Sequence, residues 1–474
     1  MKYTPKFLRG MLLSMIREMG EHPEQYVRQP GRDFTRPRTL TFETVISLLL
    51  TMSENSIGKV LIGRFQNSEK TPSASAFVQQ RQKLLPVALE TLFHRFTALL
   101  RPGKTFRGYR LLAVDGSSLK SAAYPKDPAS YRPGTPRQHG WNLWHMNALF
   151  DLENGIYTDL IVQKEHEKNE CRALCQMAGR SRVSGKVILL ADRNYESCNN
   201  LAHLEKRNWN YLIRIRDKAR GIAYGMPLPD QLEFDIPLKL TLGRLTPRQL
   251  VAQGLAVPKS YYRITPTMTF DFLESNSPDF YEISFRVVRL QTDSGNTETL
   301  ITNLDPDRFP LAALKALYAR RWGIETSFRS LKYAVGLIHL HAKKPGLVLQ
   351  EVFASFLIFN FTQAAAWAVD ASQGTAKYKR HVNFSDAVFA CCAFLRRSAA
   401  DPLPLLCLAE LSPSAFAASF IISFGILWPS AVSSFKANLM TLPGLGAKTI
   451  SLCVRKHNIY VARGSVMDTA FSKR

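Results

Sequence analysis

Two aspartates stand where they could hold metal ions. Asp115 follows the apolar run 110–114, and Asp192 follows a second apolar run, 186–191. A carboxylate at the end of a buried strand is held rigidly where the loops of a sheet open a cleft. Because Mg²⁺ prefers oxygen ligands, two such groups together indicate a metal site. One aspartate alone is also consistent with a tight turn, which residues 115–117 could form.

A third acid, Glu325, belongs to a polar group that one helix would align. Tyr318, Arg321, Glu325 and Lys332 have relative offsets of 0, 3, 7 and 14. At about 100° per residue, they fall within a stripe about 60° wide, and Arg329 joins them. Cations that neutralise phosphate beside an acid that ligates metal suit a phosphoryl-transfer site. The alternative is a surface helix with ordinary i,i+4 ion pairs.

Together these residues predict metal-dependent chemistry on a phosphodiester. Two ions about 4 Å apart can clamp the attacking and leaving oxygens of an in-line displacement. We therefore expect two Mg²⁺ ions, for which Mn²⁺ could substitute. The expected catalytic and metal-binding residues are Asp115, Asp192 and Glu325. The expected DNA contacts in this region are Tyr318, Arg321, Arg329 and Lys332.

The elements around the two aspartates predict an α/β core with a mixed sheet. Segments 147–151 and 156–162 form a hairpin pattern with a turn at 153–155. Helical segments are expected at 169–178 and 196–207, and a further strand at 211–216. We assign residues 106–216 to the first part of the core, 217–305 to a β-rich insertion, and 306–371 to the second part, which carries the Glu325 helix.

Residues 1–105 predict a helical DNA-binding domain. Thr41 and Ser73 or Ser75 are placed to cap helices. The region has 16 basic and 8 acidic residues. We expect its exposed helix faces to read DNA through Gln79, Arg81 and Lys83; a solvated helix face is the alternative. A helical C-terminal region, 372–474, could serve in dimerisation.

Overall charge favours a polyanionic partner. The chain of 474 residues has 62 Lys and Arg against 38 Asp and Glu, for a net charge of +24.

Seven cysteines without a CxxC pair indicate a reducing cytoplasm. His139, His145, His339 and His341 lack zinc-site spacing. Segment 411–435 has no charged side chain and is long enough for a membrane span, but a buried dimer helix or a decayed reading frame fits it better.

The segment 318–332 resembles a known signature. Tyr318, Arg321, Glu325 and Lys332 match the Y-(2)-R-(3)-E-(6)-K pattern of bacterial insertion-sequence transposases of the insertion-sequence-four group. Segments 113–116 and 191–193 are similar to that family's two aspartate regions. The resemblance covers about residues 30–370 and implies a ribonuclease-H-like core with a β insertion. The 133 positions from Asp192 to Glu325 agree with such an insertion.

One departure concerns the insertion. Relatives that cut DNA through a hairpin place a tryptophan there, against a flipped base. The strand 298–302 has no tryptophan, so the sequence leaves the hairpin route open.

The resemblance implies a DNA transposase that binds the ends of its own element, acts as a homodimer, and cleaves and joins DNA in the bacterial cytoplasm, associated with the nucleoid and not with a membrane. Two alternatives remain. One is a metal-dependent nuclease without strand transfer. The other is a non-catalytic DNA-binding protein derived from a transposase, against which the complete set of three acids argues.

Overall fold

The computed structural model describes residues 4–396 and the short segments 452–455 and 458–461. Within 4–396 it leaves out residues 37, 53–55, 217–220, 224–225, 227, 293–294 and 373–381. The chain divides into two compact units, Met1–Glu410 and Leu411–Arg474.

A ten-stranded sheet organises the first unit. Its strand order is β2-β3-β1-β5-β6-β10-β9-β7-β8, and β4 pairs with β3. Strands β1, β5 and β6 run parallel, whereas β3 runs antiparallel to β1 and β10 antiparallel to β6. The core strands are β1 (Arg110–Ala122), β2 (Tyr131–Arg132), β3 (Trp141–Asp151), β4 (Ile156–Lys164), β5 (Val187–Ala191) and β6 (Trp209–Arg214). The mixed α/β core predicted for this region is confirmed.

Strand β1 is longer than the sequence pattern predicts. It continues past Asp115 to Ala122 because β3 pairs with it throughout, from Leu112↔Asp151 to Ala122↔Trp141. Its parallel pairing with β5 ends at Val114↔Ala191. The expectation that Asp115 ends its strand is therefore wrong: it lies within β1, at the level where the neighbouring strand β5 stops.

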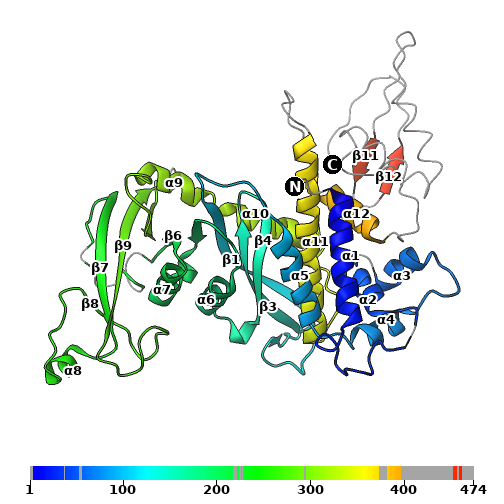
Figure 1. The fold of residues 1–474 in the computed structure, drawn as a ribbon, viewed down its shortest axis with the longest axis horizontal. Coiled ribbons are helices and arrows are strands. Elements are labelled where there is room, and N and C mark those ends of the chain that lie inside the picture. Colours follow the sequence, from blue (N-terminus) through cyan, green and yellow to red (C-terminus); the bar gives the residue numbers. More distant parts are fainter. Residues whose placement is uncertain are drawn as a thin grey trace, which may run out of the picture. The chain divides into compact units, whose positions relative to one another are not determined.

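Helices cover both faces of the core strands (Figure 1). The helices α6 (Glu170–Arg180) and α7 (Cys198–Lys206) pack on the face that carries Leu112, Val114 and Leu189. The opposite face carries Leu111 and Leu190 and packs against α9 (Leu311–Ala319). The next helix, α10 (Trp322–Tyr333), contacts β1. Short 3₁₀ turns, η1 (Glu165–Glu167) and η2 (Arg193–Tyr195), connect these elements.

Residues 217–305 form strands, as the sequence predicts, but these strands extend the core sheet. Strand β10 (Thr297–Thr302) pairs directly with β6 and links it to β9 (Phe280–Gln291). Further out lie β7 (Phe234–Gly243), α8 (Pro247–Ala252) and β8 (Tyr261–Arg263), at the left of Figure 1.

The N-terminal helices pack around one long helix, α11 (Pro345–Ser372) (Figure 1). Thr41 and Ser73 cap α2 and α4, as expected. Helix α11 is long and apolar enough to cross a membrane, but 83% of that window, within Pro345–Trp367, is buried in the protein. Burial of this extent is typical of a core helix. The other helices are α1 (Pro5–Glu21), α2 (Phe42–Leu50), α3 (Ile57–Phe65), α4 (Ala74–Arg81), α5 (Val87–Leu99) and α12 (Phe384–Arg396).

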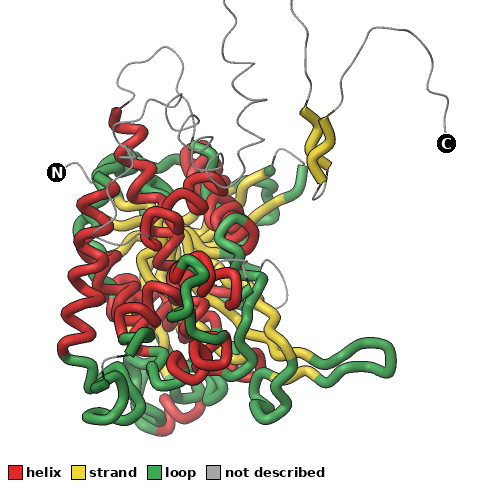
Figure 2. Tube along the Cα trace, turned by 90° about the vertical axis from the view of Figure 1, so that its right-hand side faces the viewer, coloured by secondary structure: helices red, strands yellow, loops and turns green. Residues whose placement is uncertain are grey.

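Figure 2 distinguishes the helices from the strands of the sheet that they cover. In the second unit the described residues form an antiparallel pair, β11 (Leu452–Arg455) and β12 (Asn458–Val461). This pair differs from the helical C-terminal region expected from sequence, although α12 agrees with it. The apolar segment 411–435 lies outside the described residues.

Candidate active site

The sheet register places the two aspartates on neighbouring strands. Val114 of β1 pairs with Ala191 of β5, so Asp115 and Asp192 follow at the same level. Because side chains alternate along a strand, Asp115 lies on the face of Leu111, and Asp192 on that of Leu190. That face is the one covered by α9. The pairing therefore places both carboxylates on the side from which α9 and α10 approach.

The segment that supplies Glu325 is two helices and not one. Helix α9 ends at Ala319 and α10 begins at Trp322. Between them the backbone makes i→i+3 bonds, including Arg321 N–H to Tyr318 O at 3.0 Å and Ile324 N–H to Arg321 O at 3.1 Å. Such a turn advances about 120° per residue, so the continuous 100° stripe assumed from the sequence is wrong at this point.

Arg321 joins two of the three acids. Its Nη2 donates to Glu325 Oε1 at 2.9 Å, and its Nη1 lies 3.7 Å from Asp115 Oδ2. Arg321 is 6% exposed, whereas the side chain of Glu325 is 36% exposed. The structure therefore brings Asp115, Arg321 and Glu325 together at the junction of β1 and α10.

Three buried polar atoms near this junction have no hydrogen-bond partner among the described residues. They are Asp192 Oδ1, the Tyr318 hydroxyl and Arg321 Nε. Burial raises the pKa of Tyr318 above its usual value, and the charges of Arg321 and Asp192 are close enough to influence it. An unpaired buried polar group costs roughly 1–3 kcal/mol. Three at one place indicate a site that is completed by a polar or charged ligand.

The pKa of Asp115 is perturbed in the same place. Burial raises it to about 6, against the backbone N–H of Gly116 and the positive charge of Arg321, which lower it. The negative charges of Glu325 and Asp192 raise it further. A carboxyl group crowded by other acids and removed from water gains most from a bound cation.

The donor set fits a divalent cation, although the described residues hold no preformed cluster of three His, Cys, Asp or Glu side chains for one. Arg321 contacts both Asp115 and Glu325 and places a positive charge between them. Carboxylate oxygens are the ligands that Mg²⁺ and Mn²⁺ prefer. Asp192 brings an oxygen that lacks a partner.

Tyr195 fixes the turn that follows Asp192, a role the sequence analysis missed. Its hydroxyl donates to Asn147 Oδ1 at 3.1 Å, and its backbone carbonyl accepts from Asn200 at 2.7 Å. Tyr195 is fully buried. A tyrosine three residues after the second aspartate was the available signal, but only the fold reveals its partner on β3.

Behind Asp115, Gly116 leaves space for a buried ion pair. A Cβ atom at Gly116 would lie 2.4 Å from His145 Nε2 and 2.7 Å from Glu170 Oε1, so any larger residue would displace these side chains. His145 and Glu170 are themselves 2.8 Å apart. Of the histidines considered from the sequence, His145 therefore lies behind the acids, on the opposite face of β1.

The expected DNA contacts divide into exposed and buried residues. Arg329 and Gln79 are exposed, and Lys332 and Lys83 are partly exposed. Burial lowers the pKa of Lys332. These four residues remain available to a phosphate. Tyr318, in contrast, is 6% exposed and lies beside the acids, and its contact with DNA stays a prediction.

Arg81 lies in the core and not on the outer face of its helix. It is 1% exposed and forms a 2.8 Å ion pair with Glu351 of α11. The expectation that it contacts DNA assumed a helix with one free face. Helix α4 instead packs so that its last residue enters the core, and the guanidinium is satisfied internally.

The chain is similar to known transposases in its sequence. The family described as transposase DDE domain matches residues 106–361. A relative in Escherichia coli (strain K12), the transposase InsG for insertion sequence element IS4, is 24% identical over 310 residues. That match covers 61% of this chain and 60% of the relative, so it spans less than two thirds of the relative's length.

Among solved structures, a piggyBac transposase synaptic complex with hairpin DNA aligns with a TM-score of 0.45 and 10% identity, over 83% of this chain and 80% of that one. The family match spans both aspartates, Glu325 and the strands that position them. The chain belongs to the transposase DDE domain family.

Proposed function

We propose that this protein is a DNA transposase that binds the ends of its own mobile element, cleaves them in a metal-dependent reaction and joins them to target DNA. The supporting observation is the convergence of Asp115, Asp192 and Glu325 with the unpartnered Tyr318 hydroxyl and Arg321 Nε. The inferred ribonuclease-H-like core rests on the order β4-β3-β1-β5-β6, with β5 and β6 parallel to β1.

The three acids would hold two Mg²⁺ ions, or Mn²⁺ in their place. Held by these acids, such ions would supply Lewis-acid stabilisation of the attacking and leaving oxygens. Asp115 must lose its proton to ligate a cation, and because burial raises its pKa to about 6 without metal, metal binding there should release a proton below that pH. Asp192 contributes an oxygen held in place by the turn that Tyr195 anchors.

The cations and the phenol would position the DNA. Arg321 presents a planar fork, which suits a phosphate beside the acids, and the Tyr318 hydroxyl can donate a hydrogen bond to a phosphate oxygen. Lys332 lies seven residues after Glu325 on α10, about 10 Å along the helix axis at 1.5 Å per residue. It would meet the DNA further from the scissile bond.

Recognition of the element ends is assigned to the N-terminal helices. Gln79 and Lys83 are the residues in this set that remain exposed or partly exposed. Arg81 contributes only by holding α4 against α11. The partners are double-stranded DNA of the ends and of the target. Action as a homodimer in the cytoplasm, on the nucleoid and without a membrane, completes the proposal.

Incubation of purified protein with duplexes that carry the sequences flanking its own gene tests the proposal. Wild-type protein with Mg²⁺ should cut at the element boundary and produce joined strands with a second duplex. Asp192→Asn should bind the same duplex without cutting it. Cleavage without joined products would identify a nuclease, and end binding without any cleavage a non-catalytic DNA-binding protein; either result contradicts the proposal.

A further inference from the structure

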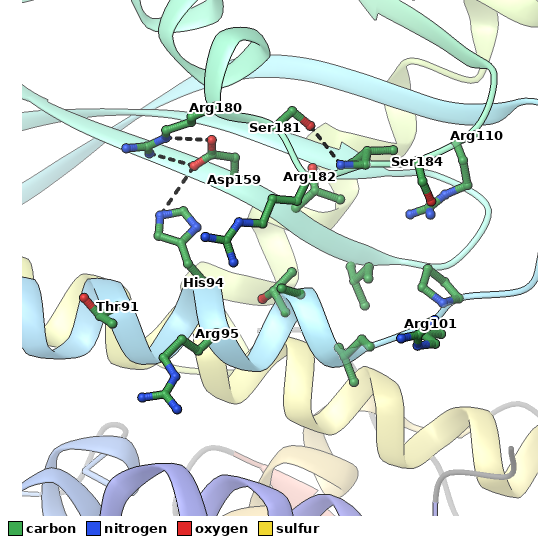
Figure 3. Close-up of a pocket in the computed structure, with 17 residues that line it drawn as sticks. Thr91, His94, Arg95, Arg101, Arg110, Asp159, Arg180, Ser181, Arg182 and Ser184 are labelled. Carbon is green, nitrogen blue, oxygen red and sulfur yellow. Dashed lines mark hydrogen bonds and ion pairs between the residues drawn. The ribbon is translucent and has the colours of Figure 1, made fainter. Parts of the chain in front are cut away.

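A second basic site lies at the opposite end of the core strands from the acids. A cavity of about 600 Å³ opens between α5, β4 and the loop 181–184, as Figure 3 shows. Arg110, which begins β1, lines it. Asp115 lies five residues further along that strand, about 17 Å away at 3.3 Å per residue. The cavity is therefore separate from the candidate active site.

Positive charge dominates the lining. One acid, Asp159, faces five arginines and one histidine. Asp159 is 4% exposed and is held by Arg180, whose Nε and Nη2 donate to it at 2.9 and 2.7 Å. This carboxylate is thus neutralised within the wall, where it offers little repulsion to an incoming anion. The basic lining residues are His94, Arg95, Arg101, Arg110, Arg180 and Arg182.

Neighbouring ion pairs fix two of the cations in place. Arg110 pairs with the fully buried Asp151, and Arg95 with Glu18 of α1. Neither of these acids lines the cavity. Guanidinium groups that are already held in position lose less conformational freedom when they bind a phosphate.

Two groups in the wall retain unused binding capacity. Arg182 is exposed and points toward His94 in Figure 3, and it has no carboxylate within ion-pair distance in the described part of the chain. His94 Nε2 is buried without a hydrogen-bond partner and lies 3.7 Å from Asp159 and 3.9 Å from Glu90, a carboxylate that Arg180 also contacts at 3.6 Å. The hydroxyls of Ser181 and Ser184 stand nearby. A phosphate oxygen could accept hydrogen bonds from the Arg182 guanidinium and from these hydroxyls.

The lining also favours a phosphate over a nucleotide base. Apart from the His94 ring it contains no aromatic side chain on which a base could stack. Arg182 and Ser184 are exposed, so a bound phosphate can belong to a longer chain.

We propose that this cavity binds a backbone phosphate of duplex DNA outside the catalytic cleft. The assignment of DNA rests on the proposed function; the phosphate chemistry rests on the lining. Since the site is about 17 Å from the acids along β1, it would hold a DNA segment other than the one being cut, and so orient the bound duplex.

Salt-dependent binding tests this proposal. Anisotropy of a labelled end duplex is measured with the full chain at several salt concentrations. Arg182→Gln should reduce the slope of log K against log salt by about 0.9, and weaken binding about tenfold near 0.1 M salt. Arg248→Gln, the same charge change at an exposed residue of α8, should leave the slope unchanged. Cleavage at saturating DNA should be unaffected in Arg248→Gln.

The outcomes separate this proposal from the proposed function. If wild-type protein binds and cuts DNA but Arg182→Gln keeps the wild-type slope, only the cavity assignment fails. Inorganic phosphate could raise the melting temperature of wild-type protein but not of Arg182→Gln. If the two proteins then show the same salt slope for DNA binding, the cavity binds free phosphate and its assignment to DNA fails. A wild-type chain that neither binds nor cuts the end duplex overturns both proposals. A slope reduced only in Arg182→Gln supports the DNA site.

Discussion

Two arginine–glutamate pairs in this molecule have nearly the same length and opposite surroundings. Arg81 and Glu351 are 2.8 Å apart, and Arg321 and Glu325 are 2.9 Å apart. Both arginines are buried. The glutamate side chains differ, because Glu351 is 7% exposed and Glu325 is 36% exposed.

The first pair is complete. Arg81 also donates to Gln350 and to the carbonyl of Leu347, and Glu351 accepts from the backbone N–H of His341 at 2.8 Å. Burial raises the pKa of Glu351, but hydrogen bonds from His341 and the charge of Arg81 outweigh it and hold the pKa below its usual value. This pair joins α4 to α11 and leaves no polar atom for a ligand.

The second pair is incomplete. Arg321 Nε, Asp192 Oδ1 and the Tyr318 hydroxyl lack partners, and the pKa of Asp115 is raised. An arginine–glutamate pair therefore indicates a functional site when polar atoms beside it lack hydrogen-bond partners. We call a pair closed when all its polar atoms have hydrogen-bond partners, and such a pair stabilises the fold. We call it open when neighbouring polar atoms lack partners, which indicates a ligand-binding site.

The largest effect should come from the acids. Asp115→Asn, Asp192→Asn and Glu325→Gln should each lower end cleavage by at least about 10³-fold, because each removes a charged metal ligand. Double variants should lose little more than single ones, since the acids act as a unit. Cleavage time courses at saturating Mg²⁺ measure this, with end binding as the control. A variant that cuts at the wild-type rate would remove its residue from the site.

Breaking the closed pair should affect folding and not chemistry. Arg81→Met leaves Glu351 buried without its partner and should lower the free energy of unfolding by about 3–5 kcal/mol. Cleavage per folded molecule should stay at the wild-type level. Adding Glu351→Leu should recover most of the stability. Chemical denaturation measures both variants; a stable Arg81→Met that binds DNA poorly would instead restore the DNA-contact role.

Breaking the Arg321–Glu325 pair should lower cleavage and leave folding stability nearly unchanged. Arg321→Ala should reduce cleavage about 10–100-fold, as loss of a group that orients metal ligands does, with little change in melting temperature. Arg320→Ala is the matched control, because that arginine pairs with Glu153 away from the acids. Near-wild-type cleavage by Arg321→Ala would reduce its contact with Glu325 to a helix pair of about 0.3–0.5 kcal/mol.

Lys332→Ala should weaken DNA binding, and less so at low salt.

The smallest effect concerns the pH dependence of stability. The folded-state pKa of Asp115 is raised to about 6, so the folded protein holds this proton more tightly than the unfolded chain does. Wild-type protein should therefore lose stability relative to Asp115→Asn as pH rises from about 4 to 6, by on the order of 1–3 kcal/mol. Melts in chelator across this range, compared with melts in Mg²⁺, test this; equal curves for both proteins would contradict it.

Local signals in the sequence predicted much of this fold. The apolar runs before Asp115 and Asp192, the β3–β4 hairpin and the caps at Thr41 and Ser73 depend on neighbours within a few residues, and all are found in the structure. The sequence also aligned Glu325 with Arg321, which the structure confirms at 2.9 Å.

Long-range partners explain what the sequence did not predict. The extension of β1 to Ala122 depends on pairing with β3, about 25 residues away in the chain. The burial of Arg81 depends on Glu351, which is 270 residues away. The two residues between α9 and α10 are arginines, and neither is the proline or glycine that would signal a break in a helix. Each of these features is set by packing that periodicity alone does not encode.

The position of α11 has a consequence for how the chain is made. During synthesis the helices α1, α2 and α5 leave the ribosome hundreds of residues before α11, against which they pack. Their apolar faces, including Leu8, Val45 and Phe93, have to wait for that helix. A nascent chain that stops before residue 345 would therefore expose these faces and be prone to aggregation. Because α11 follows the Glu325 segment in the chain, the N-terminal helices can pack fully only after that segment has been translated.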